Sequence, residues 1–160
     1  MERIASFTVD HTVLVPGLYL SRRDGDVTTF DLRFKRPNTG DLLSNAELHS
    51  VEHLVATILR NSPQKDAVIY FGPMGCQTGF YFLFDSRKLS DAEAIHLLQI
   101  VFSAAASYGG RLPGRSAAEC GNFVNLDRTL AHRCCLWYSE LIRNWTVEQL
   151  AYPVRETEQF

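Results

Sequence analysis

The sequence predicts an α+β fold in which an antiparallel sheet carries helices packed on one face, a two-layer sandwich in a single domain. Three observations predict it: a segment with strict apolar alternation, two apolar arms around a glycine-rich bend, and two capping boxes that each precede an apolar run with helical spacing. We expect the domain to span residues 1–160, with a core over residues 4–145 and a tail, 146–160, to which the sequence assigns no role.

The strands are predicted from side-chain alternation and from the bend. In residues 27–34 apolar side chains alternate with Asp31 and Arg33, so this strand should be half-buried. Residues 67–71 and 79–84 are apolar, aromatic-rich arms. The bend between these arms is rich in glycine and contains Cys76, which should therefore be exposed on a loop held by a rigid scaffold.

Two helices are predicted from their N-terminal caps. Ser44 and Glu47 form a capping box, and the apolar positions that follow it continue to Leu59. An equivalent box starts at Ser90 and precedes an apolar run that extends toward Gly109. These two segments should pack their apolar faces on the sheet.

A third helix is predicted after Cys120, with its end near Asn144. Its apolar stripe is expected at Leu126, Leu130, Cys134, Trp137 and Leu141. Cys134 and its neighbour Cys135 are interpreted as packing residues. His96 and His132 have no partner at metal-ligand spacing, so we place them outside any site.

Composition limits the classes of partner. The chain has 160 residues and a formal net charge of −2, with no basic cluster for nucleic acid and no apolar run long enough for a bilayer. The N-terminal residues show no signal-peptide core. We therefore expect a cytoplasmic protein without nucleic-acid or membrane partners, in which the four cysteines are free thiols.

The segment His49-Ser50-Val51-Glu52-His53 carries the strongest chemical signal. Histidines at i and i+4 of a helix share one face and can bind one ion, whereas Glu52 is offset and suited to move protons. Cys120 is the candidate third ligand, and three ligands keep a fourth position open, as in catalytic sites. The motif also resembles the inverted zincin signature of metalloproteases. A histidine pair without metal and a half-buried cysteine stay open as alternatives.

Five motifs follow one another along most of the chain. They are Ser6-Phe7-Thr8-Val9-Asp10-His11, Phe30-Asp31-Leu32-Arg33-Phe34, His49-Ser50-Val51-Glu52-His53, Pro73-Met74-Gly75-Cys76-Gln77-Thr78-Gly79 and Cys120-Gly121-Asn122. In this order and spacing they resemble the S-ribosylhomocysteine lyases, the LuxS family of autoinducer-2 synthesis. The resemblance covers residues 4–145 and implies cleavage of S-ribosylhomocysteine to homocysteine and 4,5-dihydroxy-2,3-pentanedione, by carbonyl migration and β-elimination of the thioether.

The resemblance also implies roles for individual residues. The positions that match the family's metal ligands are His49, His53 and Cys120. Those that match its acid/base residues are Glu52 and Cys76. Those that match its substrate pocket are Ser6, His11 and Arg33. The implied cofactor is one divalent ion per subunit, ferrous iron first, with zinc or cobalt as replacements. The implied assembly is a homodimer with active sites at its interface.

The chain departs from the usual residues of the family at Tyr70, Gly72 and Leu126. None of these positions is an implied ligand or proton carrier. Two other functions stay open. One is an inverted-zincin-type metallohydrolase, which would not need Cys76. The other is a non-catalytic protein with a structural metal, which would need four protein ligands.

Overall fold

The computed structural model describes residue 4 and residues 7–155, and this part of the chain forms one α+β domain. The strands are β1 (Gly17–Asp24), β2 (Val27–Arg33), β3 (Val68–Pro73) and β4 (Gly79–Asp85). The helices are α1 (Asn45–Arg60), α2 (Asp91–Ala106) and α3 (Arg128–Ile142). Short 3₁₀ turns cover Lys65–Ala67, Phe123–Asn125 and Val147–Gln149. The predicted fold class is confirmed.

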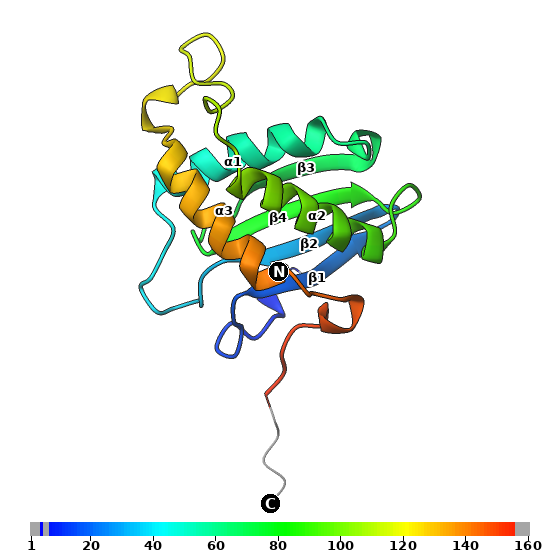
Figure 1. Cartoon of the computed structure of the whole chain (residues 1–160). Coiled ribbons are helices and arrows are strands. Elements are labelled where there is room, and N and C mark those ends of the chain that lie inside the picture. The colour runs from blue at the N-terminus through cyan, green and yellow to red at the C-terminus, as the bar shows by residue number, and fades with distance from the viewer. Residues whose placement is uncertain (1–3, 5–6, 156–160) are drawn as a thin grey trace, which may run out of the picture.

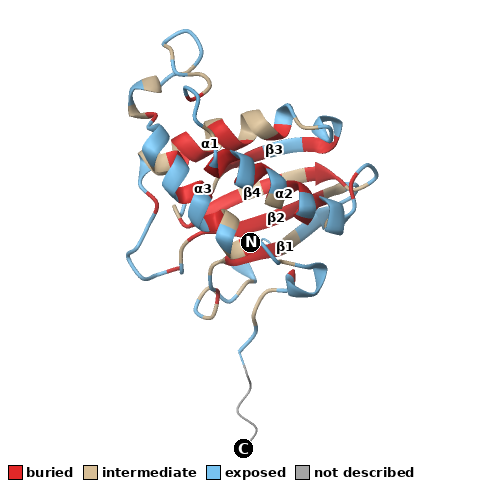
Figure 2. Cartoon of the chain, viewed as in Figure 1, coloured by how far each residue is buried: buried red, intermediate tan, exposed pale blue. Residues whose placement is uncertain are grey.

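The strands form one antiparallel sheet in the order β1-β2-β4-β3. The helices α1, α2 and α3 lie over one face of this sheet (Figure 1). Buried residues concentrate on the strands and on the helix surfaces turned toward them, whereas the outer helix surfaces are exposed (Figure 2). The core therefore lies between the two layers, as expected for a sandwich that buries one face of each helix.

The strand β1 has no counterpart in the sequence prediction. It pairs with β2 through a tight turn at Gly25, where Asp24 lies opposite Val27. Gly25 has a φ of 59°, a conformation that glycine adopts without steric cost. The Asp-Gly pair between two apolar segments was the available signal, because it is typical of short hairpin turns.

The prediction of a half-buried β2 was wrong, because the strand is buried on both faces. Phe30 and Leu32 face the helices and are fully buried, as expected from alternation. Asp31 and Arg33 face the other side, yet they are only 1% and 2% exposed. They form an ion pair that other segments of the chain cover, so a charged face here does not mean a solvated face.

Both predicted capping boxes are confirmed. The Ser44 side chain accepts a hydrogen bond from the Glu47 backbone N–H, and the Glu47 carboxylate accepts one from the Ser44 backbone. Ser90 and Glu93 make the same pair of bonds at the start of α2. Each box satisfies two backbone donors that the first helical turn leaves unpaired. The helix α2 ends at Ala106, before the glycines.

Of the predicted stripe, Leu126 and Cys134 are buried, and Leu126 lies before the start of α3. The buried side chains of this helix are Ala131, Cys134, Cys135, Tyr138 and Ile142. Trp137 is 45% exposed instead. Both stripes have helical spacing, so periodicity alone does not choose between them. The structure selects Tyr138 because its ring stacks on Phe34 at 4.1 Å and its hydroxyl donates to the Gly17 carbonyl.

An aromatic cluster ties the two layers together. Phe102 of α2 is fully buried and lies within 6.0 Å of Phe34 and 4.8 Å of Tyr138, measured between ring centroids. We predict that Phe102→Ala lowers the free energy of unfolding by about 3–5 kcal/mol, because the cavity would not be refilled. Ile100→Ala on the same helix, at a site 54% exposed, is the control. Urea denaturation measures both, and equal effects would contradict the assignment of the core.

Candidate metal centre and active site

The helix α1 places two histidines side by side near its N-terminus. His49 and His53 are one turn apart, and their rings lie 4.5 Å from each other between centroids, at right angles. Cys120, from the loop between α2 and α3, brings its Sγ to 3.3 Å from His49 Nε2. One ligand atom from each of the three residues lies within 4.8 Å of the others, the only such group of histidines, cysteines and carboxylates among the described residues.

Hydrogen bonds orient both rings. His49 Nδ1 donates to the Asn125 side-chain oxygen at 2.5 Å, and His53 Nδ1 donates to the Pro113 carbonyl at 2.9 Å. Each ring then keeps Nε2 free to bind a metal, the usual arrangement of metal-binding histidines. A β-carbon at Gly114 would lie 2.8 Å from His53 Nδ1, so glycine allows the loop to approach this ring.

The residues present fit a divalent transition metal. Two imidazoles and a thiolate suit zinc, iron and cobalt, and three protein ligands leave a position for water or substrate. Glu52 lies on α1 between the two histidines, half-buried, and its carboxylate is outside the group of close ligand atoms. This position suits a proton carrier beside the site better than a fourth ligand.

Cys76 lies at the bend between β3 and β4. The bend is closed by Met74 N, which donates to the Gly79 carbonyl at 2.9 Å, and by Gln77, whose φ is 62°. As predicted, the Cys76 side chain is exposed. Its Sγ lies 3.0 Å from Thr78 Oγ1, so the bend presents the thiol with a hydroxyl beside it.

Arg33 lies beside this thiol and is held from two sides. Its guanidinium makes a bidentate pair with Asp31, with Nε to Oδ1 at 3.1 Å and Nη2 to Oδ2 at 2.5 Å. Its Nη1 donates to Thr78 Oγ1 at 2.6 Å and lies 3.9 Å from Cys76 Sγ. Burial opposes the charge, but the attraction of Asp31 and its hydrogen bonds raise the pKa of Arg33. A fixed positive charge therefore lies next to the thiol.

Cys76 and Arg33 open into a cavity of about 650 Å³. His11 and Phe7, both before β1, contribute to its wall. The residues that line it are Phe7, His11, Arg33, Pro37, Asn38, Gly40, Leu42, Met74, Gly75, Cys76, Thr78 and Tyr81. The structure thus brings Cys76, Arg33 and His11 together around one cavity. The predicted contact residue Ser6 lies outside the described residues.

The metal group and this cavity belong to different sides of the sheet. Arg33 alternates with Leu32 and Phe34, which pack beneath the helices, so Arg33 points to the face that the helices leave free. His49 and His53 project from α1, which lies over the opposite face (Figure 1). The cavity lining includes none of the three metal-group residues.

Comparison with known proteins gives one consistent result. The family model for S-ribosylhomocysteinase (LuxS) matches residues 4–148. An S-ribosylhomocysteine lyase of Desulfotalea psychrophila is 45% identical over 159 residues, covering 96% of this chain and 99% of the relative. One from Clostridium acetobutylicum is 42% identical over 158 residues, with the same coverage. One from Phocaeicola vulgatus is 40% identical and covers 98% of this chain and all of the relative.

The chain belongs to the LuxS family. The matched residues include every candidate site residue named above, from Ser6 to Cys120. In the part of this LuxS chain that the structure describes, no helix has the length and apolar character needed to cross a membrane.

Tyr70 and Gly72, two of the positions expected from the sequence to depart from the family, form one local unit. Tyr70 of β3 is 48% exposed, and its ring lies over Gly72, where a β-carbon would overlap the tyrosine hydroxyl. A larger residue at position 72 would therefore displace the Tyr70 ring. The third such position, Leu126, is 2% exposed and packs in the core. Asp127 beside it caps α3, accepting from Thr129 N and Leu130 N.

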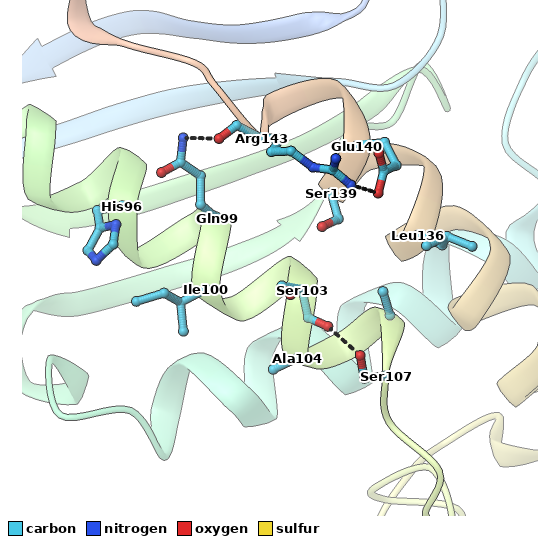
Figure 3. A pocket seen from close by; sticks show the side chains of 11 residues that line it. His96, Gln99, Ile100, Ser103, Ala104, Ser107, Leu136, Ser139, Glu140 and Arg143 are labelled. Atoms are coloured by element: carbon cyan, nitrogen blue, oxygen red, sulfur yellow. Dashed lines mark hydrogen bonds and ion pairs between the residues drawn. The ribbon is translucent and has the colours of Figure 1, made fainter.

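The remaining thiols and histidines of this LuxS chain lie away from both clusters. Cys134 and Cys135 are buried, as predicted, and burial is the main reason that the pKa of Cys134 is raised to about 11. His96 and His132 are exposed. His96 lines a groove of about 710 Å³ beside α2 and α3 (Figure 3). This groove contains no second group of metal-ligating side chains among the described residues.

Asn125 is a site residue that the sequence did not suggest. It lies 76 residues from His49 in the chain, and its own Nδ2 donates to Asn45 Oδ1 at 2.7 Å. We predict that Asn125→Ala weakens metal binding about 10- to 100-fold, the usual effect of losing a hydrogen bond behind a metal ligand. Competition with a chromophoric chelator measures the affinity, and Asn144→Ala, at an exposed position, is the control. An unchanged affinity would contradict the role of Asn125.

Proposed function

We propose that this protein cleaves S-ribosylhomocysteine to homocysteine and 4,5-dihydroxy-2,3-pentanedione, the precursor of autoinducer-2. The observation that carries the proposal is the match to S-ribosylhomocysteine lyases over 96% of the chain. The close group of His49, His53 and Cys120 supports it, since the reaction is expected to require a metal ion.

The substrate itself determines what the site must do. β-Elimination of a thioether needs an acidic C–H between a carbonyl and the carbon that carries sulfur. In S-ribosylhomocysteine the carbonyl starts at C1 and the sulfur is on C5, so the carbonyl has to move to C3 before C4–H becomes acidic. Each shift removes a proton from one carbon and returns one to its neighbour. The site therefore needs at least one group that both accepts and donates protons.

Cys76 and Glu52 are the proposed proton carriers. Cys76 Sγ lies at the cavity, 3.9 Å from Arg33 Nη1, where its sulfur can exchange a proton with a carbon atom of the bound substrate. Glu52 lies on α1 between the two histidines in the sequence, and its proposed task is to exchange protons with the sugar hydroxyls. Arg33, His11 and Ser6 are the proposed substrate contacts. When bound, the divalent ion would act as a Lewis acid toward the sugar oxygens.

We propose ferrous iron as the ion, held by His49, His53 and Cys120, with zinc or cobalt able to replace it. The donor set supports this choice without deciding among the three metals. We also propose a cytoplasmic location, which the four free cysteines support because reducing compartments keep thiols free.

We propose a homodimer whose active sites form between subunits. The cavity with Cys76 and the metal group lie on different sides of the sheet, whereas the reaction requires them at one substrate. Exposed apolar side chains at the cavity support an interface there, since Phe7 is 65% and Leu42 is 44% exposed. In a symmetric dimer, the cavity of one subunit can face the metal group of the partner subunit, and the two-fold symmetry gives two equivalent sites.

The direct test is an anaerobic assay of the iron-loaded protein with S-ribosylhomocysteine. Protein is removed by filtration, and the free thiol of homocysteine is titrated. We expect one thiol per substrate consumed. A fully metal-loaded protein that releases none would contradict the lyase reaction and favour a structural metal, whereas hydrolysis of peptides under the same conditions would favour a metallohydrolase.

A further inference from the structure

The C-terminal segment, residues 150–155, lies beyond the residues that the family model matches, yet it is tied to the body of the protein. The Leu20 backbone N–H donates to the Leu150 carbonyl at 2.8 Å, and the Leu150 side chain is 5% exposed. The Tyr152 ring stacks on the ring of Tyr19 at 5.1 Å, with an angle of 27° between them. These contacts fix the segment against β1.

Tyr152 reaches the buried ion pair on the free face of the sheet. Its hydroxyl donates to Asp31 Oδ2 at 2.7 Å, and the same oxygen accepts from Arg33 Nη2 at 2.5 Å. Burial of the phenol, followed by the charge of Asp31, raises the pKa of Tyr152, so the hydroxyl stays protonated and remains a donor. Asp31 is thereby held from both sides.

The ion pair of Asp31 and Arg33 links Tyr152 to the cavity. Arg33 and Asp31 side chains are only 3% and 2% exposed, so each depends on protein partners for its hydrogen bonds. Arg33 continues to Thr78 and Cys76 at the cavity wall. A continuous series of contacts therefore runs from the C-terminal segment to the proposed proton carrier.

The far end of the segment contacts the loop that bears His11. Arg155 lies 3.2 Å from the Asp10 carboxylate and donates to Thr12 Oγ1 at 2.9 Å. These residues flank His11 on both sides. The Arg155 pair is exposed and contributes little by itself, but it places the segment against the chain neighbours of His11 as well as against the partner of Arg33.

We propose that residues 150–155 position the substrate cavity, and that Tyr152 is a positioning residue that holds Arg33 through Asp31. This inference rests on the proposed function, in which Arg33 contacts the substrate. It gives a role to part of the tail for which the sequence suggests none.

The test compares Tyr152→Phe with Val154→Ala. The first variant keeps the ring and removes only the hydroxyl, and the second changes an 82% exposed side chain of the same segment. We expect Tyr152→Phe to raise KM about three- to tenfold with little change in kcat, because a hydrogen bond to a charged group is lost behind a substrate contact. Val154→Ala should behave as wild type. An unchanged KM in an active Tyr152→Phe enzyme would overturn the inference.

A second measurement does not depend on turnover. In zinc-loaded protein, solvent exchange of the Arg33 Nε proton is followed by NMR, with Arg33→Lys identifying the signal. Tyr152→Phe should exchange several-fold faster than wild type, whereas equal rates would overturn the inference. If wild type fails to cleave the substrate, the proposed function fails, and proton exchange still decides whether Tyr152 holds Arg33.

Discussion

Cys76→Ala should leave metal binding intact and strongly reduce cleavage. We expect kcat to fall by about 100- to 10,000-fold, the usual contribution of a positioned acid/base group. The thiol is exposed at the cavity and belongs to no part of the metal group, so its removal should not disturb His49, His53 or Cys120. Metal content by atomic absorption and homocysteine release measure the two effects.

Two further variants make the result specific. His53→Ala should lose metal and activity together, because only two ligands of the group would remain. Cys134→Ala removes a buried thiol outside the cavity and should keep both activity and metal. A metal-loaded Cys76→Ala protein that cleaves at the wild-type rate would contradict the role of Cys76 as a proton carrier.

Mixing two inactive variants should restore activity. If the active site combines the Cys76 cavity of one subunit with the metal group of the other, a dimer of Cys76→Ala and His53→Ala contains one intact site and one doubly defective site. Random exchange makes half of the dimers mixed, so we expect about a quarter of the wild-type activity for a symmetric two-site dimer.

The mixed sample distinguishes assembly models sharply. If each site formed within one chain, every site would carry a defect and the mixture would stay inactive. The experiment therefore refolds the two variants together and assays them beside each variant alone, with metal in excess. Light scattering should give the mass of a dimer. Absence of recovered activity in a verified mixed dimer would contradict the composite site.

The sequence predicts the site best where its geometry is local. The capping box and the histidine spacing place His49 and His53 on one helix face because a helix repeats every 3.6 residues. The exposure of Cys76 follows from glycine and proline in the bend. Contacts between distant segments could not be predicted from local spacing. Asn125 lies 76 residues from His49, and Tyr152 lies 121 residues from Asp31, with no periodicity that links them.

The errors in the predicted fold also arise from contacts between distant segments. Charged residues on one face of β2 predict that this face is exposed to solvent. The prediction fails here because distant residues, Tyr152 and Thr78, cover the face and form hydrogen bonds with its charged side chains. The α3 helix has apolar residues on more than one face, so its orientation depends on which aromatic ring packs best against Phe34. In the structure, the Tyr138 ring stacks on Phe34. Both outcomes depend on tertiary packing that a local pattern does not contain.

The loop between α2 and α3 contains little regular structure apart from the Phe123–Asn125 turn, and it projects from the body of the molecule (Figure 1). It supplies Cys120, Asn125 and the Pro113 carbonyl to the metal group. Ordering such a segment costs conformational entropy, and an ion that binds only the ordered form offsets part of that cost. If the metal-free loop samples other conformations, the protein binds the metal more weakly than a preformed site would. Substitutions in this loop that touch no ligand can still change how much metal the protein holds at a given free concentration.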